Sequence, residues 1–150
     1  MRVITGTARG RVLRTLEGED VRPTTDRVKE AVFSIIQFEI EGRRVLDLFA
    51  GSGQLGIEAL SRGAASATFV DMSKDSLSTV KYNLEHTKLG DNAKVVQTDA
   101  LSFLKLTKDR FDIVFLDPPY ASSLVVDSMK LLSDVVAAGG CAICETPGDS

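Results

Sequence analysis

The sequence has no long apolar run and no apolar leader. No stretch approaches the roughly 20 consecutive apolar residues that a membrane-spanning helix requires. The first residues carry arginines in place of the apolar region of a signal peptide. We therefore expect a cytoplasmic protein with no membrane partner. Its 150 residues suffice for one compact domain with a sizeable core, and we expect a monomer.

Cysteine and histidine, the residues suited to zinc binding or redox chemistry, are also scarce. The chain has two cysteines and one histidine, His86. Cys141 and Cys144 form a C-x-x-C pair, but a redox pair of this spacing needs a helix N-terminus, and the flanking residues 140–145 are typical of a strand. Side chains at i and i+3 of a strand point to opposite faces. We predict two buried thiols and no metal site.

An overall excess of positive charge is absent as well. The formal net charge of −3 does not suggest that the body of the protein binds nucleic acid. The distribution is uneven, because residues 1–14 hold Arg2, Arg9, Arg11 and Arg14 and no acidic residue. A basic arm on an acidic body can bind phosphate groups. A solvated tail is the alternative, and charge alone does not separate the two.

From residue 43 onward, the pattern alternates between strands and helices. Apolar runs flanked by Gly, Asp or Pro predict five strands, at Arg44–Phe49, Ser66–Val70, Ala93–Gln97, Phe111–Leu116 and Gly140–Cys144. Repeated βα units imply a mostly parallel, doubly wound sheet with helices on both faces and right-handed crossovers. The sequence therefore predicts an α/β, Rossmann-like fold.

Apolar residues at helical spacing predict the helices between these strands. The predicted helical stripes are Leu55, Ala59 and Leu60; Leu77, Val80 and Leu84; Leu101 and Leu104; and Val125, Met129, Leu132 and Val136. An earlier helix would place Val28, Ala31, Val32, Ile35 and Ile36 on one face, with Thr24 or Thr25 as its cap. We expect residues 1–42 to form a basic arm or hairpin with this packing helix. Residues 43–150 would form the Rossmann-like domain, and the two parts one compact unit.

A glycine-rich turn follows the first predicted strand. Gly51, Gly53 and Gly56 satisfy the G-x-G-x-x-G fingerprint, in which glycines let a ligand approach the backbone. Asp71 ends the next strand, where an acid can bind a ribose. This pattern fits two classes of enzyme, a nicotinamide-dependent oxidoreductase and an S-adenosylmethionine methyltransferase.

Two further acids bear on that choice. Asp47 precedes the glycines, where a carboxylate can face a cationic ligand but would repel a pyrophosphate, which favours the methyltransferase. Asp99 follows the third strand and can accept a hydrogen bond from an adenine amino group, or else cap the next helix. No histidine or tyrosine is placed for hydride transfer.

Asp117-Pro118-Pro119-Tyr120 follows the fourth predicted strand directly. The Asp117 carboxylate and the Pro118 carbonyl could accept hydrogen bonds from the exocyclic amine of a base, while Pro119 stiffens the backbone. Tyr120 could stack on the base, which contributes about 1–3 kcal/mol on such platforms. The tetrad therefore predicts methyl transfer to a planar amine.

With these motifs in view, the chain resembles the RsmD-type methyltransferases, which methylate the guanine N2 amine in small-subunit ribosomal RNA. The resemblance rests on Arg9-Gly10-Arg11, on 22–30, on Asp47 through Gly63, and on the tetrad 117–120. It implies a class I methyltransferase fold that binds S-adenosylmethionine. In that family the sheet continues beyond this chain, so the resemblance also implies a shortened form that lacks the last two strands and has an exposed edge.

The resemblance implies a role for each group of residues. The cofactor residues would be Asp47, Phe49, Ala50, Gly51, Ser52, Gly53, Asp71, Met72, Asp99 and Ala100. The catalytic residues would be Asp117, Pro118 and Tyr120, and Pro119 with Arg9, Arg11, Arg22 and Thr24 would contact RNA. The expected partner is ribosomal RNA or the assembling small subunit. A DNA base amine, a protein glutamine amide and, more distantly, an NAD-dependent oxidation are the alternatives.

Overall fold

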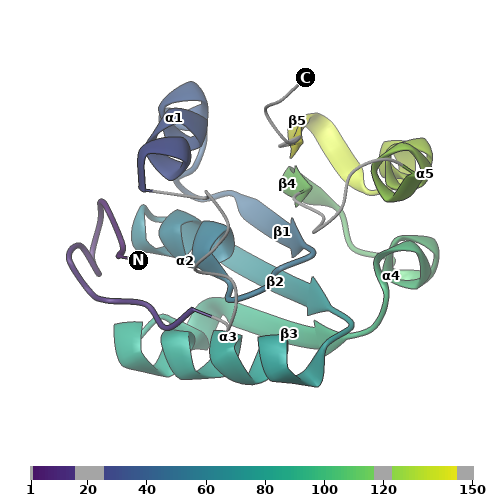
Figure 1. Ribbon diagram of the computed structural model, residues 1–150. Helices are drawn as coiled ribbons and strands as arrows, with labels where there is room; N and C mark the ends of the chain where they lie inside the picture. Colours follow the sequence, from purple (N-terminus) through teal and green to yellow (C-terminus); the bar gives the residue numbers. More distant parts are fainter. Residues whose placement is uncertain (1, 16–25, 117–122, 145–150) are drawn as a thin grey trace.

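The computed structural model describes residues 2–15, 26–116 and 123–144. In these residues the fold is built on a five-stranded sheet with the order β3-β2-β1-β4-β5, and every neighbouring pair is parallel (Figure 1). The strands are β1 Arg44–Leu48, β2 Ser66–Asp71, β3 Ala93–Gln97, β4 Phe111–Leu116 and β5 Val136–Cys144. The predicted α/β class is therefore confirmed, and so are the five predicted strands, although β5 begins earlier than predicted.

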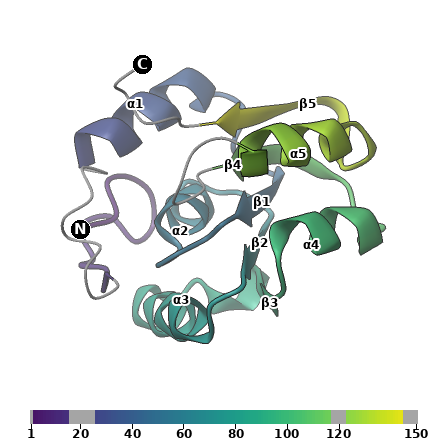
Figure 2. The same cartoon turned by 45° about the vertical axis from the view of Figure 1, so that its right-hand side comes forward.

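Helices cover both faces of the sheet. They are α1 Asp26–Ile36, α2 Gln54–Ser61, α3 Lys74–Thr87, α4 Ala100–Leu106 and α5 Ser123–Leu131. Figures 1 and 2 show α1, α2 and α3 on one face and α4 and α5 on the other. Successive strand residues point to opposite faces. Val45 accordingly joins the core beneath α1–α3, and Leu46 joins the core beneath α4.

Local sequence explains where two of these helices begin or end. The Ser73 hydroxyl caps α3 by accepting the N–H of Ser76 at 3.2 Å. Gly63, which follows the C-terminal cap Arg62 of α2, has a φ of +104°. That conformation is accessible to glycine and terminates the helix.

The N-terminal arm is a packed hairpin and not a solvated tail. Arg2 and Val12 form an antiparallel bridge. Val3, Ala8 and Leu13 are buried and belong to the same core cluster as α1, α2 and α3. Residues 2–15 therefore share the core of the sheet domain.

The buried face of α1 differs from the prediction. Phe33 and Ile36 are buried together with Lys29, whereas Ile35 is 74% exposed and Ala31 is exposed. The apolar pattern was misleading because a charged residue occupies the core-facing stripe. Lys29 is accommodated there by a buried carboxylate on α2, which hydrophobicity alone does not reveal.

The prediction for the C-terminal helix was also wrong at its end. The α5 helix stops at Leu131, a short 3₁₀ helix spans Leu132–Asp134, and Val136 already begins β5. Met129, assigned to the buried stripe, is exposed. The pairing of β4 with β5 is irregular close to Gly139, which has a φ of +81°. This irregularity interrupts the strand pattern of β5, so the sequence did not reveal the first half of that strand.

Cys141 lies on β5, at the edge of the sheet as described. It is half-buried, and not buried as predicted. Burial is the main cause that raises the pKa of its thiol, and the charge of Glu39 adds to it. A raised pKa lowers the thiolate population and the reactivity of the thiol. The side chain of Cys144 lies outside the described part of the chain.

Candidate functional site

The predicted site lies at the carboxyl edge of the sheet. The chain runs from β1 to β2 and β3 on one side of β1, then returns to β4 on the other. Such a reversal opens a crevice at the carboxyl ends of the strands, where α/β proteins bind ligands. The glycine loop 49–53 follows β1 at this edge, Asp71 ends β2, and Asp99 follows β3.

The backbone of the glycine loop has an unusual conformation. Phe49, Gly51 and Gly53 all have positive φ, of 66°, 58° and 83°. The loop is held by the N–H of Ala50, which donates to the carbonyl of Val70 at 2.9 Å. Positive φ is accessible to glycine but costs a bulky residue such as Phe49 of the order of 1–3 kcal/mol. Strain of this kind collects at functional sites, and the sequence contained no signal for it at Phe49.

Asp71 ties the glycine loop to the end of β2. One carboxylate oxygen, Oδ2, accepts the N–H of Gly51 at 2.9 Å, and Oδ1 accepts the N–H of Ser73 at 2.8 Å. Each oxygen has a second lone pair. Asp71 can therefore fix the loop and still accept a hydrogen bond from a ligand hydroxyl.

Asp47 lies beneath the loop, only 1% exposed. Its Oδ2 accepts the N–H of Gly56 at 2.9 Å and so joins the first turn of α2 to β1. A Cβ atom on Gly56 would lie 2.4 Å from Cε2 of Phe69, which explains the third glycine of the fingerprint by close packing of α2 on β2. Asp47 thus positions the start of α2, a role that the sequence interpretation did not include.

Asp99 caps α4. Its Oδ2 accepts the N–H of Ser102 at 2.9 Å, and hydrogen bonding from Ser102 is the main cause that lowers the pKa of the Asp99 carboxyl. The capping alternative raised by the sequence is therefore confirmed. The cap uses Oδ2, and an ionised carboxylate at this edge remains a suitable acceptor for an amino group.

The two other predicted residues at this edge differ in exposure. Met72, directly after β2, is 69% exposed, whereas Ala100 at the start of α4 is buried. The carbonyl of Met72 accepts the side-chain amide of Gln97 at 3.4 Å. An exposed thioether beside a crevice can pack on a flat ligand.

Other predicted residues fall elsewhere. Arg9 and Arg11 are exposed on the N-terminal hairpin. Several predicted residues lie outside the described residues, namely Arg22, Thr24, Asp117, Pro118, Pro119 and Tyr120. Leu116, the last described residue of β4, pairs in register with Leu48, which precedes the glycine loop.

Among the described residues, no group of His, Cys, Asp or Glu could hold a metal ion, and no helix is long and apolar enough to cross a membrane.

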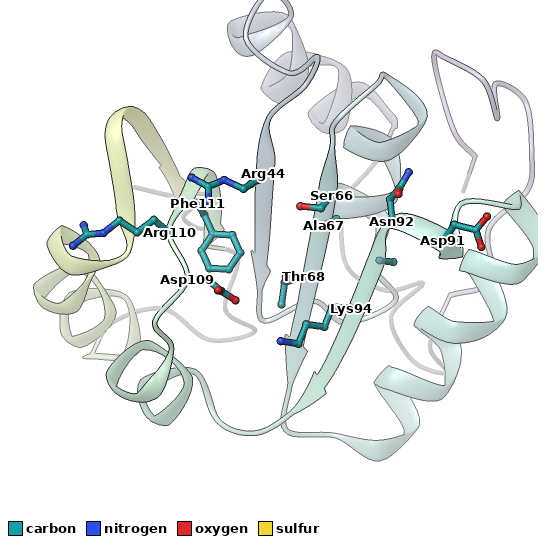
Figure 3. Close-up of a pocket in the computed structure, with 11 residues that line it drawn as sticks. Arg44, Ser66, Ala67, Thr68, Asp91, Asn92, Lys94, Asp109, Arg110 and Phe111 are labelled. Carbon is teal, nitrogen blue, oxygen red and sulfur yellow. The ribbon is translucent and has the colours of Figure 1, made fainter.

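A separate pocket of about 440 Å³ lies at the opposite, amino ends of the strands (Figure 3). Arg44, Ser66 and Phe111, which begin β1, β2 and β4, contribute to its lining. Charges of both signs surround it, including Lys94 and Asp109. None of the predicted site residues that the structure describes lines this pocket, and α/β folds bind ligands at the other edge.

Known proteins that are similar to this chain indicate its family. The family model described as "Conserved hypothetical protein 95" matches residues 1–150. The chain is 42% identical over 137 residues to ribosomal RNA small subunit methyltransferase D of Haemophilus influenzae, covering 89% of this chain and 71% of that protein. It is 43% identical over 134 residues to the protein of the same name from Escherichia coli, covering 89% and 67%.

Solved structures agree with the sequence matches. A hypothetical protein from Thermus thermophilus, TTHA0928, superposes with a TM-score of 0.84 at 34% identity, covering 96% of this chain and 84% of that one. An S-adenosylmethionine-dependent methyltransferase from Thiobacillus denitrificans, in complex with S-adenosyl-L-homocysteine, shares the fold with a TM-score of 0.70 at 20% identity, covering 84% and 52%. The fold is the Rossmann-like class I methyltransferase fold.

Proposed function

The chain belongs to the RsmD-type methyltransferase family, whose model is described as "Conserved hypothetical protein 95", and from this premise we propose that it methylates ribosomal RNA with S-adenosylmethionine as the methyl donor. The finer proposal is that the acceptor is the N2 amine of a guanine in small-subunit RNA. The observation that carries the proposal is the glycine loop at the carboxyl edge, which is held by Asp71, with Asp99 after β3 at the same edge.

The residues at this edge fit the chemical groups of S-adenosylmethionine. Asp71 would accept hydrogen bonds from the ribose hydroxyls, and Asp99 from the adenine amino group. The exposed side chain of Met72 would pack on the adenine ring. The backbone of the loop from Phe49 to Gly53, with Ala50, Gly51 and Ser52 between them, would border the methionine part, and the charge of Asp47 beneath the loop favours a cationic ligand.

When bound, S-adenosylmethionine supplies an electrophilic methyl group on a sulfonium. The proposed acceptor is a poor nucleophile, because the lone pair of an aromatic amine is delocalised into the ring. The Asp117 carboxylate and the Pro118 carbonyl would accept its two protons in hydrogen bonds and favour a pyramidal nitrogen. Tyr120 would stack on the base and Pro119 would stiffen the turn. Holding both reactants in line supplies a large part of the acceleration. The amine nitrogen would form a bond to the methyl carbon as the bond from that carbon to sulfur breaks, and Asp117 would take the released proton or pass it to water.

The N-terminal hairpin would face the RNA. Arg9 and Arg11 are exposed on it, and Arg22 and Thr24 follow in sequence. Arginine side chains bind the phosphate groups of a nucleic acid and release its counterions. Affinity for ribosomal RNA should therefore fall as salt rises, with a slope that is reduced in Arg9→Ala and Arg11→Ala.

Two measurements test the proposal. Calorimetry should detect S-adenosylmethionine binding to the wild type and to Asp117→Ala alike, while the variant transfers no methyl group to RNA. Loss of cofactor binding in Asp117→Ala would contradict the assigned role of Asp117. Mass analysis of nucleosides from the methylated RNA should show N2-methylguanosine, whereas modification of DNA, of a protein glutamine or of another base would refute the finer proposal.

A further inference from the structure

Asn83 is a fully buried polar residue in the middle of α3. Its Oδ1 accepts the backbone N–H of Arg14 at 2.8 Å. Its Nδ2 donates to the carbonyl of Arg14 at 2.9 Å and to the carbonyl of Ser52 at 3.0 Å. The side-chain amide has two N–H donors. Both of them, together with the oxygen, bind the backbone of other segments.

The two segments that Asn83 joins belong to different parts of the proposed enzyme. Ser52 lies in the glycine loop, next to Gly51, whose N–H is held by Asp71. Arg14 lies at the end of the N-terminal hairpin, where its guanidinium sits 3.7 Å from the centre of the Tyr82 ring. One side chain therefore connects the loop proposed for the cofactor with the arm proposed for RNA.

This connection leaves little freedom for either segment to move alone. A shift of Arg14 or Ser52 would break a hydrogen bond to an amide that is 0% exposed, and water could not replace it. A buried polar group without its partner is costly. The ordered positions of the arm and the loop should therefore be populated together.

We propose that Asn83 is a positioning residue that couples RNA binding on the arm to cofactor binding in the glycine loop. The inference rests on the proposed function. A ligand that orders one segment lowers the entropy that the other ligand must still lose, which gives positive cooperativity. Linkage is reciprocal, so RNA should tighten the cofactor by the same factor as the cofactor tightens RNA.

Affinity for S-adenosyl-L-homocysteine tests the coupling, since this product analogue permits no turnover. Calorimetry measures this affinity with and without a saturating fragment of unmodified small-subunit ribosomal RNA. For the wild type, the ratio of the affinity with RNA to the affinity without it should be at least about 5, the lower end of usual coupling factors. In Asn83→Asp the ratio should fall to about 1. Aspartate can still accept the Arg14 N–H but cannot donate to the carbonyl of Ser52.

Thr87→Val is the matched control. Thr87 is also buried in α3, but within the described part of the chain its hydroxyl binds only carbonyls of the same helix, those of Asn83 and Leu84. This variant should lose stability and keep the wild-type ratio. A merely structural role for Asn83 would reduce stability in both variants and leave both ratios unchanged, which would overturn the inference.

A pair of variants on the arm tests the same bond without altering α3. Arg14→Pro removes the N–H that Asn83 accepts, whereas Arg14→Ala retains it. The ratio should fall to about 1 in Arg14→Pro and exceed that value in Arg14→Ala. Equal ratios in the two variants, or a wild type that binds both ligands independently, would refute the coupling. A wild type that does not bind S-adenosyl-L-homocysteine at all would instead refute the proposed function and the inference with it.

Discussion

Removal of the buried carboxylate of Glu58 on α2 tests most clearly what stabilises the fold. Its carboxylate is 0% exposed and lies 3.4 Å from Nζ of Lys29, which is also 0% exposed. The same carboxylate accepts the N–H of Ile4 at 2.9 Å and that of Thr5 at 3.0 Å, and pairs with Nε of Arg62 at 2.9 Å. One buried charge thus joins the N-terminal arm, α1 and α2.

Glu58→Gln preserves the shape of the side chain, removes its charge and replaces one of its two acceptor oxygens, each of which accepts a backbone N–H, with an amide donor. Removing one partner of a buried ion pair costs about 3–5 kcal/mol, because the charge that stays in the core loses the attraction of that partner. This is a large part of the roughly 5–15 kcal/mol that usually separates folded from unfolded states. With a urea m-value of about 2 kcal/mol/M, the unfolding midpoint should fall by roughly 2 M.

Urea titration followed by circular dichroism measures this change, since the chain has no tryptophan. Adding Lys29→Met should recover part of the loss, because the core then holds one charge fewer. The coupling between the two changes should lie within about 0.5–3 kcal/mol. Arg44→Gln is the control: Nε of Arg44 lies 3.7 Å from Asp112 in a side chain that is 51% exposed, so its loss should cost under about 1 kcal/mol. A Glu58→Gln effect as small as that, or strict additivity with Lys29→Met, would refute the reasoning.

Three further changes have defined outcomes. Gly56→Ala should destabilise the fold by about 1–3 kcal/mol in urea titrations, because the added methyl group overpacks against Phe69. Gly90→Ala is the control and should not destabilise the fold, because a Cβ atom there meets no described atom closer than 3.9 Å. Equal effects of the two substitutions would contradict the packing argument. Ser128→Ala removes a buried hydroxyl that has no hydrogen-bond partner among the described residues, so the thermal midpoint should rise, and a fall would show that the hydroxyl is satisfied. The pKa of Asp99 is lower in the folded protein than the ordinary aspartate value of 3.8, so its ionised carboxylate stabilises the fold at neutral pH. This stabilisation is lost as the pH falls below 3.8 and through the pKa that Asp99 has in the folded protein. Asp99→Asn should flatten that acid limb of the stability curve, and an unchanged limb would assign it to other carboxyls.

The sheet could be predicted because its strands are short apolar runs between turn-forming residues. The predicted bounds of β3 and β4 coincide with those observed, and β1 and β2 differ by one residue at one end. Parallel strands buried on both faces leave little ambiguity in such runs. β5 was half missed because an irregular pairing near Gly139 interrupts it.

The burial of charged groups could not be predicted in the same way. The apolar pattern placed Ile35 in the core and gave no indication that Lys29 lies there, because the Glu58 carboxylate and the Arg2 carbonyl that bind Lys29 are distant from it in sequence. The arm was ambiguous for the same reason. Its backbone is held by Glu58 and by Asn83 on α3, and neither contact has a local signature.

The site was predictable in composition but less so in geometry. Asp71 and Asp99 lie at the carboxyl edge, as the strand pattern indicates, and Asp99 also caps its helix. The sequence motif specifies neither the positive φ of Phe49 nor the burial of Asp47, whose carboxylate binds the start of α2.

Transfer of a labelled methyl group tests the central claim most directly. The chain would be incubated with S-adenosylmethionine labelled in its methyl group and with unmodified small-subunit ribosomal RNA, and the labelled nucleotide would then be mapped. We predict label at a single guanine for the wild type and none for Asp117→Ala. Wild-type protein that binds S-adenosylmethionine but leaves the RNA unlabelled would contradict the account.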